Sequence, residues 1–158
     1  MSRMGRGIIV HPGELTLSWL DWMQEAKLNT LGLHPVGGIK AHETLQQAID
    51  THPLPACKAL RAEANARGIK VEYEAHVMAW LLPRNLFLHE PSWFRMDIRG
   101  ERTPDFNLCA SNADALAYVA QRTALLASLL DTGSSDYYFW MDDVTDCGCH
   151  RPDCQRPS

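Results

Sequence analysis

The sequence predicts an α/β protein whose parallel strands form the first four βα units of a (β/α)8 barrel, as a half barrel or an amino-terminal fragment. Two observations lead to this prediction: strand-like and helix-like segments alternate along the 158 residues, and polar side chains follow the apolar runs. Such alternation favours parallel strands joined by right-handed helical crossovers. An open parallel sheet is the alternative, because a complete barrel typically takes about 250 residues. The length favours a single domain over residues 1–158.

The first two strands are expected in the apolar runs 7–12 and 29–38, each of which contains a His-Pro pair. A helix is expected over 15–28, where apolar residues recur at helical spacing and Thr16 or Ser18 could cap the first turn. The residues expected on its apolar face are Leu15, Trp19, Met23 and Ala26.

Two helices and the third strand come next in the chain. The helices are expected over 42–50 and 55–68; Pro55 suits the first turn of the second one, and Gly68 suits its end. Strict alternation of apolar and polar residues predicts a strand over 69–77. One face would carry Ile69, Val71, Tyr73, Ala75 and Val77, and the other Lys70, Glu72, Glu74 and His76.

The second half of the chain is expected to hold a long connection, one helix and one strand. Residues 83–111 are polar and aromatic, and a connection of this length in a compact domain is usually functional. A helix follows over 112–130, with Asn112 as its cap, and a fourth strand over 136–143. The expected apolar face of this helix consists of Leu116, Val119, Ala120, Thr123 and Leu126.

Composition excludes several classes of partner. A net charge of −4 with scattered basic residues offers no basic face for nucleic acid and no patch for a membrane surface. No apolar run approaches the ~20 residues of a membrane span, and the first residues lack the apolar core of a signal peptide. Five cysteines without a signal peptide favour a reducing compartment. We therefore expect a cytoplasmic protein with no nucleic-acid or membrane partner.

Polar side chains stand at the end of each expected strand: His11, His34, His76, and the pair Asp142 and Asp143. In parallel architectures, sites gather at the carboxyl ends of the strands, so we expect the three histidines to contact a substrate. The turn after the first strand lacks G-x-G-x-x-G, which disfavours dinucleotide binding.

Asp142 and Asp143 are candidates for acid–base chemistry. Glycoside hydrolysis commonly uses two carboxylates that flank the sugar bond. The alternative is that one aspartate caps the loop and the other is solvated. Four aromatic residues could stack on sugar rings, although each could equally belong to the core: Trp80, Trp93, Phe94 and Trp140.

A cysteine cluster follows the fourth strand. Cys147, Cys149 and Cys154 form C-x-C-x4-C with His150 beside them, and Cys109 precedes a helix at the same end of the sheet. Thiolates and imidazole are suitable zinc ligands, so the four cysteines predict a zinc site with a structural role. The alternative is a loop of reduced thiols without a metal.

Three segments carry a resemblance to a known family: "YEAHVMAWLLPRNLF" (73–87), "PSWFRMDIRGERTPDFNLCASN" (91–112) and "YYFWMDDVTDCGCHRPDC" (137–154). Together they resemble an uncharacterised bacterial family of glycoside-hydrolase-like barrels. That family is related to alpha-glucuronidases and, distantly, to beta-hexosaminidases. The resemblance runs from about Ile8 to Cys154 and includes a family L-C-x-S-N motif before a helix. The family's third cysteine matches Cys154 only after two extra residues.

The resemblance implies a (β/α)8 barrel that acts on carbohydrate or binds it. It implies that Asp143 is the acid and that Asp142 orients the substrate, with Asp143 in place of the usual glutamate. It also puts Asn112, in the matching motif, among the substrate-binding candidates. Family members continue past the cysteine loop.

Four strands of a barrel leave two open edges, which invite pairing. We therefore expect either a homo-oligomer or a missing carboxyl-terminal half of the barrel. Three functions remain open from the sequence: a glycoside hydrolase, a non-catalytic glycan-binding module, and a small zinc-stabilised structural protein.

Overall fold

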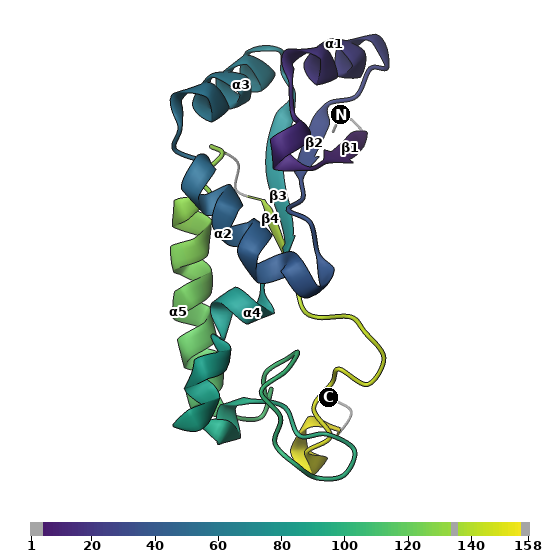
Figure 1. Cartoon of the computed structure of the whole chain (residues 1–158). Coiled ribbons are helices and arrows are strands. Elements are labelled where there is room, and N and C mark those ends of the chain that lie inside the picture. The colour runs from purple at the N-terminus through teal and green to yellow at the C-terminus, as the bar shows by residue number, and fades with distance from the viewer. Residues whose placement is uncertain (1–4, 134–135, 156–158) are drawn as a thin grey trace. The chain divides into compact units, whose positions relative to one another are not determined.

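The computed structural model of the chain describes residues 5–133 and 136–155, and these form an α/β fold (Figure 1). A four-stranded, all-parallel sheet has the order β1-β2-β3-β4, so the strands follow one another in space as they do in sequence. The strands are β1 (Gly7–Val10), β2 (Thr30–Leu33), β3 (Lys70–His76) and β4 (Tyr137–Trp140). Gly7 of β1 pairs with Thr30 of β2, which pairs with Lys70 of β3. The parallel α/β class predicted from the sequence is confirmed.

The first two strands are shorter than predicted. β1 ends at Val10, one residue before the His-Pro pair, and Pro12 begins a short 3₁₀ turn, Pro12–Glu14. β2 ends at Leu33, again just before a His-Pro pair. Proline has no N–H to donate to a neighbouring strand, which explains why neither strand continues.

Five α-helices accompany the sheet in the described residues. They are α1 (Leu17–Glu25), α2 (Ala41–Thr51), α3 (Pro55–Ala66), α4 (Met78–Leu81) and α5 (Ala113–Leu129). Helix α4 was not predicted, because four residues are too few to show a helical period. Within the long connection 83–111, the chain forms two 3₁₀ turns and two isolated antiparallel bridges, Phe94 with Leu108 and Met96 with Arg102.

Strand β3 has the two faces that the sequence predicts. Its apolar face is buried, from Val71 to Ala75 and on into Val77. On the other face, Lys70 Nζ lies 3.0 Å from Glu72 Oε2 and also pairs with Asp136. Glu72 is itself only 7% exposed, so the charged face is partly covered, and Lys70 offsets the buried charge of Glu72.

Helix faces were predicted less well than strand faces. In α5 the buried residues are Ala115 and Leu126, whereas the expected Leu116 is 47% exposed. Apolar residues occur all round this helix, so its sequence period does not single out one face. In α1 the expected Met23 is buried, but so is Leu20, which was not predicted.

Two helix ends follow from local sequence. The Oδ1 of Asn112 accepts a hydrogen bond from the Ala115 N–H at 2.9 Å, which confirms Asn112 as the cap of α5. Lys27, just past α1, has a φ of 57°, and the Leu28 N–H donates to the Met23 carbonyl at 2.8 Å. Lys27 thus ends α1 in the left-handed conformation, at a position where glycine is the usual residue.

The chain divides into two compact units. Unit 1 comprises Met1–Ala75 and Ala127–Phe139, and unit 2 comprises His76–Leu126 and Trp140–Ser158. The core of unit 1 combines buried side chains of β1–β3 with those of α1–α3, including Leu20, Leu31, Leu33, Leu45, Ala64, Val71 and Tyr73. The core of unit 2 includes Val77, Trp80, Leu82, Phe94, Cys109, Leu126 and Cys149. None of the helices in residues 5–133 and 136–155 is long and apolar enough to cross a membrane.

Candidate metal centre

Three cysteines of unit 2 bring their thiols together. Cys109 follows the bridge residue Leu108 in the long connection, and Cys149 and Cys154 belong to the segment after β4. The three Sγ atoms all lie within 4.8 Å of one another. Cys109 and Cys149 are buried, and Cys154 is half-buried. This cluster could hold a metal ion such as zinc.

The spacing of the sulfurs fits a tetrahedral ion. Zinc binds thiolate sulfur at about 2.3 Å, and tetrahedral angles then set two ligand sulfurs about 3.8 Å apart. Cys109 Sγ and Cys154 Sγ are 3.8 Å apart. The third sulfur, at most 4.8 Å from the other two, needs an approach of no more than about 1 Å. No further Cys, His, Asp or Glu among the described residues joins the cluster.

The charges around Cys109 favour a thiolate. Burial would raise the pKa of Cys109, but hydrogen bonds with Arg102, Ser111 and Arg151 outweigh burial and lower the pKa to about 6. Burial raises the pKa of Cys149. Metals bind the thiolate form, so Cys109 is ready to bind at neutral pH. A divalent ion on three thiolates carries one excess negative charge, and the two guanidinium groups offset it.

Backbone contacts hold the Cys149 segment in place. The Met96 N–H donates to Cys149 Sγ at 3.3 Å, and the His150 N–H donates to the Met96 carbonyl at 2.8 Å. The Gln155 side chain donates to the Cys149 carbonyl at 2.7 Å. The bonds with Met96 hold the Cys149 segment against the part of the connection 83–111 that contains the Met96–Arg102 bridge. The position of the Cys149 thiol is therefore set by this connection as well as by its own loop.

Cys147, which the sequence placed among the ligands, lies outside the thiol cluster. Its thiol donates to the Asp142 carbonyl at 2.8 Å. Residues 142 to 147 close a tight loop there, and Asp146 takes a φ of 56° within it. The structure therefore brings together three of the four predicted thiols, because the loop turns the Cys147 side chain inward to its own backbone.

The side chain of Asn107 holds the 142–147 loop through hydrogen bonds to its backbone. Its Nδ2 donates to the carbonyls of Asp142 at 2.8 Å and Cys147 at 3.2 Å, and its Oδ1 accepts from the Asp142 N–H at 2.9 Å. Asn107 is only 5% exposed. Arg95, also buried, adds a bidentate pair with Asp105 and a bond to the Asp146 carbonyl at 2.9 Å.

The two candidate acids have different surroundings. Asp142 is half-buried, and its Oδ2 accepts from Arg84 Nη2 at 3.3 Å. Burial lowers the pKa of Arg84, and its Nη1 is buried with no partner among the described residues. Asp143 is exposed. Asp142 is thus fixed through backbone and side chain, whereas the next carboxylate is presented to solvent.

The other sequence-predicted residues fall into separate places. In unit 1, His11 Nδ1 donates to the His34 carbonyl at 2.6 Å, and His34 Nδ1 donates to the Glu74 carbonyl at 2.7 Å. In unit 2, His76 lies edge-on to Trp140, with ring centroids 5.2 Å apart. His11 and His34 directly follow β1 and β2, and His76 is the last residue of β3. Contacts of these histidines with a substrate stay a prediction.

Trp80 and Asn112 have structural roles. Trp80 is 6% exposed and lies under the guanidinium of Arg122, 3.9 Å from the ring centroid. This position leaves Trp80 no open face for a sugar. Asn112 uses its Oδ1 to cap α5, and its Nδ2 donates to Ser92 at 3.3 Å. Of the other predicted sugar-stacking residues, Phe94 is buried, Trp93 is half-buried and Trp140 is 36% exposed.

Sequence reasoning missed Asn107, Arg84 and Arg95. All three lie in the long connection 83–111, which was singled out as functional only for its length. A polar residue next to the buried Leu108–Cys109 pair was the available signal for Asn107, since a buried amide needs partners.

Comparison of the chain with known proteins finds no matching family model, no matching curated protein and no matching solved structure. The resemblance to glycoside-hydrolase-like barrels therefore stays a prediction.

Proposed function

We propose that the chain is a zinc-binding protein whose ion is held by Cys109, Cys149 and Cys154, with solvent in the fourth position. The 3.8 Å separation of two of the thiols carries this proposal. The ion would tie the segment after β4 to the connection before α5, and so fix the loop that bears Asp142. Structural zinc sites usually have four protein ligands, whereas three ligands with solvent are usual in catalytic sites. The structural role proposed here therefore rests on the link between these two segments of the chain.

Chelation tests this proposal. A ligand that binds only the native state raises stability by mass action, so removing zinc should lower the melting midpoint and re-adding it should restore the midpoint. Cobalt substitution should give the intense thiolate-to-metal absorbance of a tetrahedral site. A melt that does not respond to a chelator or to zinc would contradict the proposal. A zinc-free protein that loses two thiols on mild oxidation would instead indicate a disulfide between Cys109 and Cys154.

A second function, carbohydrate chemistry, is favoured by the residues at the end of β4. Trp140 is exposed beside His76, and the fixed Asp142 and the exposed Asp143 follow it after Met141. We propose that the four parallel strands are the first half of a (β/α)8 barrel. The strand order supports this, because doubly wound sheets reverse their order and this sheet does not. The barrel's sites gather at these carboxyl ends.

Melting in the presence of uronic acids, N-acetylhexosamines and short oligosaccharides tests the second function. A shift with one sugar class, lost in Trp140→Ala and kept in Trp22→Ala, would support it. Trp22 is the matched control because it is exposed but lies on α1 in unit 1. Asp143→Asn should abolish turnover in an enzyme and leave affinity intact in a glycan-binding module. A melting midpoint that shifts with none of these sugars would count against both the enzyme and the glycan-binding module.

A further inference from the structure

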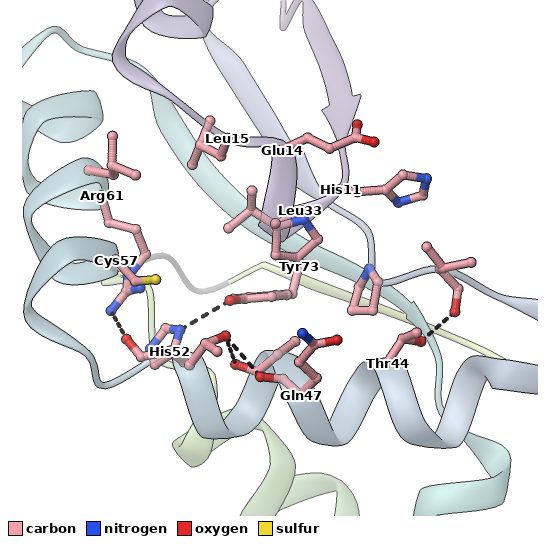
Figure 2. Close-up of a pocket in the computed structure, with 17 residues that line it drawn as sticks. His11, Glu14, Leu15, Leu33, Thr44, Gln47, His52, Cys57, Arg61 and Tyr73 are labelled. Atoms are coloured by element: carbon pink, nitrogen blue, oxygen red, sulfur yellow. Dashed lines mark hydrogen bonds between the residues drawn. The ribbon is translucent and has the colours of Figure 1, made fainter.

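Unit 1 contains a pocket of about 460 Å³ that neither proposed function uses. It lies between the carboxyl ends of β1 and β2 and the helices α2 and α3 (Figure 2). The volume lies in the usual range for sites of small organic ligands. Most of the lining is apolar, including Leu15, Leu33, Val36, Ala48 and Leu60.

One cation faces this apolar space. Arg61 of α3 lines the pocket and is only 8% exposed. Its Nη2 donates to the carbonyl of His52, the residue that ends α2, at 2.9 Å. In Figure 2, the guanidinium reaches the end of the pocket where Cys57 and His52 lie.

The charge of Arg61 has no carboxylate partner among residues 5–133 and 136–155. The ion pairs of the described arginines involve Arg67, Arg84, Arg95, Arg99 and Arg151. Glu14 also lines the pocket, but Figure 2 places it beside His11, away from Arg61. Arginine carries five N–H donors, so one bond to a carbonyl leaves most of them unused. A buried cation without a counter-ion is costly, and an anion would offset that cost.

The two polar side chains beside Arg61, His52 and Tyr73, carry no negative charge. The Asp131 carboxylate, whose charge acts on His52, forms no ion pair with Arg61. His52 Nε2 donates to the Asp131 carbonyl at 2.8 Å, so His52 Nδ1 is the acceptor for the Tyr73 hydroxyl at 3.2 Å. Burial, and then the charge of Arg61, lower the pKa of His52, which is therefore neutral. Burial also raises the pKa of Tyr73 to about 12, which keeps the hydroxyl protonated. These two groups satisfy each other and supply no negative charge.

We propose that this pocket binds a small organic carboxylate with an apolar body. The carboxylate would pair with Arg61, which suits a planar bidentate partner, and the body would lie against the apolar lining. The proposal is independent of the thiol cluster, which belongs to the other unit.

Cys57 provides a reporter, because it lines the same end of the pocket as Arg61. Iodoacetate is a small carboxylate, and iodoacetamide is its neutral counterpart. We would measure the alkylation rate of Cys57 with each reagent by peptide mass spectrometry. The ratio of the iodoacetate rate to the iodoacetamide rate would then be divided by the same ratio for N-acetylcysteine amide. Attraction to Arg61 should raise the normalised ratio at least about fivefold. A normalised ratio near one, or a Cys57 that neither reagent modifies, would overturn the proposal.

Two variants and a larger ligand sharpen the test. Arg61→Gln should abolish the preference for iodoacetate, and Arg61→Lys, which keeps the charge, should retain part of it. Protection of Cys57 by 3-phenylpropanoate, but not by 3-phenylpropanamide, would show that the apolar body is accommodated. An unchanged preference in Arg61→Gln would refute the role of Arg61. If Arg61→Gln fails to fold, the ratio measured in the unmodified chain still decides.

Discussion

Replacing Asn107 with aspartate should strongly destabilise unit 2. The introduced carboxylate would keep the acceptor for the Asp142 N–H, but its second oxygen would face the carbonyls of Asp142 and Cys147, which Asn107 Nδ2 now contacts at 2.8 and 3.2 Å. Two hydrogen bonds of about 1 kcal/mol each are lost at a site 5% exposed. The Cys147 carbonyl and one carboxylate oxygen are left without a donor, and the Asp142 carbonyl keeps only the Cys147 thiol. We expect Asn107→Asp to lower the free energy of unfolding by about 3 kcal/mol or more.

Asn112→Asp is the matched control, because it makes the same chemical change at a helix cap. The carboxylate would still accept from the Ala115 N–H and would favour the amino end of α5. It would lose the Nδ2 bonds to Ser92, but these are exposed and long at 3.3 Å. Its cost should stay within about 0.5 kcal/mol. Urea unfolding, followed by tryptophan fluorescence and far-ultraviolet circular dichroism in zinc-containing buffer, measures both. If Asn107→Asp cost no more than Asn112→Asp, Asn107 would not organise the loop after β4.

Three further predictions concern unit 1. Lys27→Gly should raise the free energy of unfolding by about 1 kcal/mol, since Lys27 holds a φ of 57°, and Lys27→Ala should bring no such gain; thermal unfolding compares them. The folded-state pKa of His52 is lowered from 6.5 by burial and by Arg61, so the unfolded chain binds more protons as the pH falls below about 6.5. Stability should therefore be lost as the pH falls from about 6.5 toward the folded-state pKa, and His52→Gln should flatten that part of the urea-unfolding profile. Gly7→Ala should cost about 1–3 kcal/mol, because its Cβ would lie 2.9 Å from the Thr30 carbonyl oxygen. Gly32→Ala should cost less in the same denaturation assay, because its Cβ meets chiefly the flexible end of the Glu74 side chain; equal costs would contradict this reasoning.

Elements with a simple period could be predicted from the sequence, and those shaped by tertiary packing could not. Strand β3 alternates strictly, and its two faces are as predicted. Helix α5 has apolar residues on several sides, so only its tertiary contacts choose Ala115 over Leu116 for burial. The carboxyl ends of β1 and β2 were missed by two and five residues, because proline stops the pairing of a strand before it stops an apolar run.

Three of the four thiols predicted as metal ligands lie together in a cluster that could hold a metal ion, and Cys147 lies apart from it. Cysteine counting found all four thiols, and sequence spacing favoured the C-x-C pair. Which thiol turns outward depends on the path of residues 142–149, and that path is set by Asn107 and Arg95 from a distant segment. Spacing along the chain carries no information on such contacts, so Cys147 could not be told from Cys149 in advance.

The zinc content of three proteins tests the central claim most directly: the unmodified chain, Cys109→Ser and Cys147→Ser. Each would be saturated with zinc, dialysed, and measured by inductively coupled plasma mass spectrometry. The thiol cluster predicts one zinc per chain in the unmodified protein and in Cys147→Ser, and none in Cys109→Ser. Loss of zinc from Cys147→Ser, or its retention in Cys109→Ser, would contradict the proposed centre.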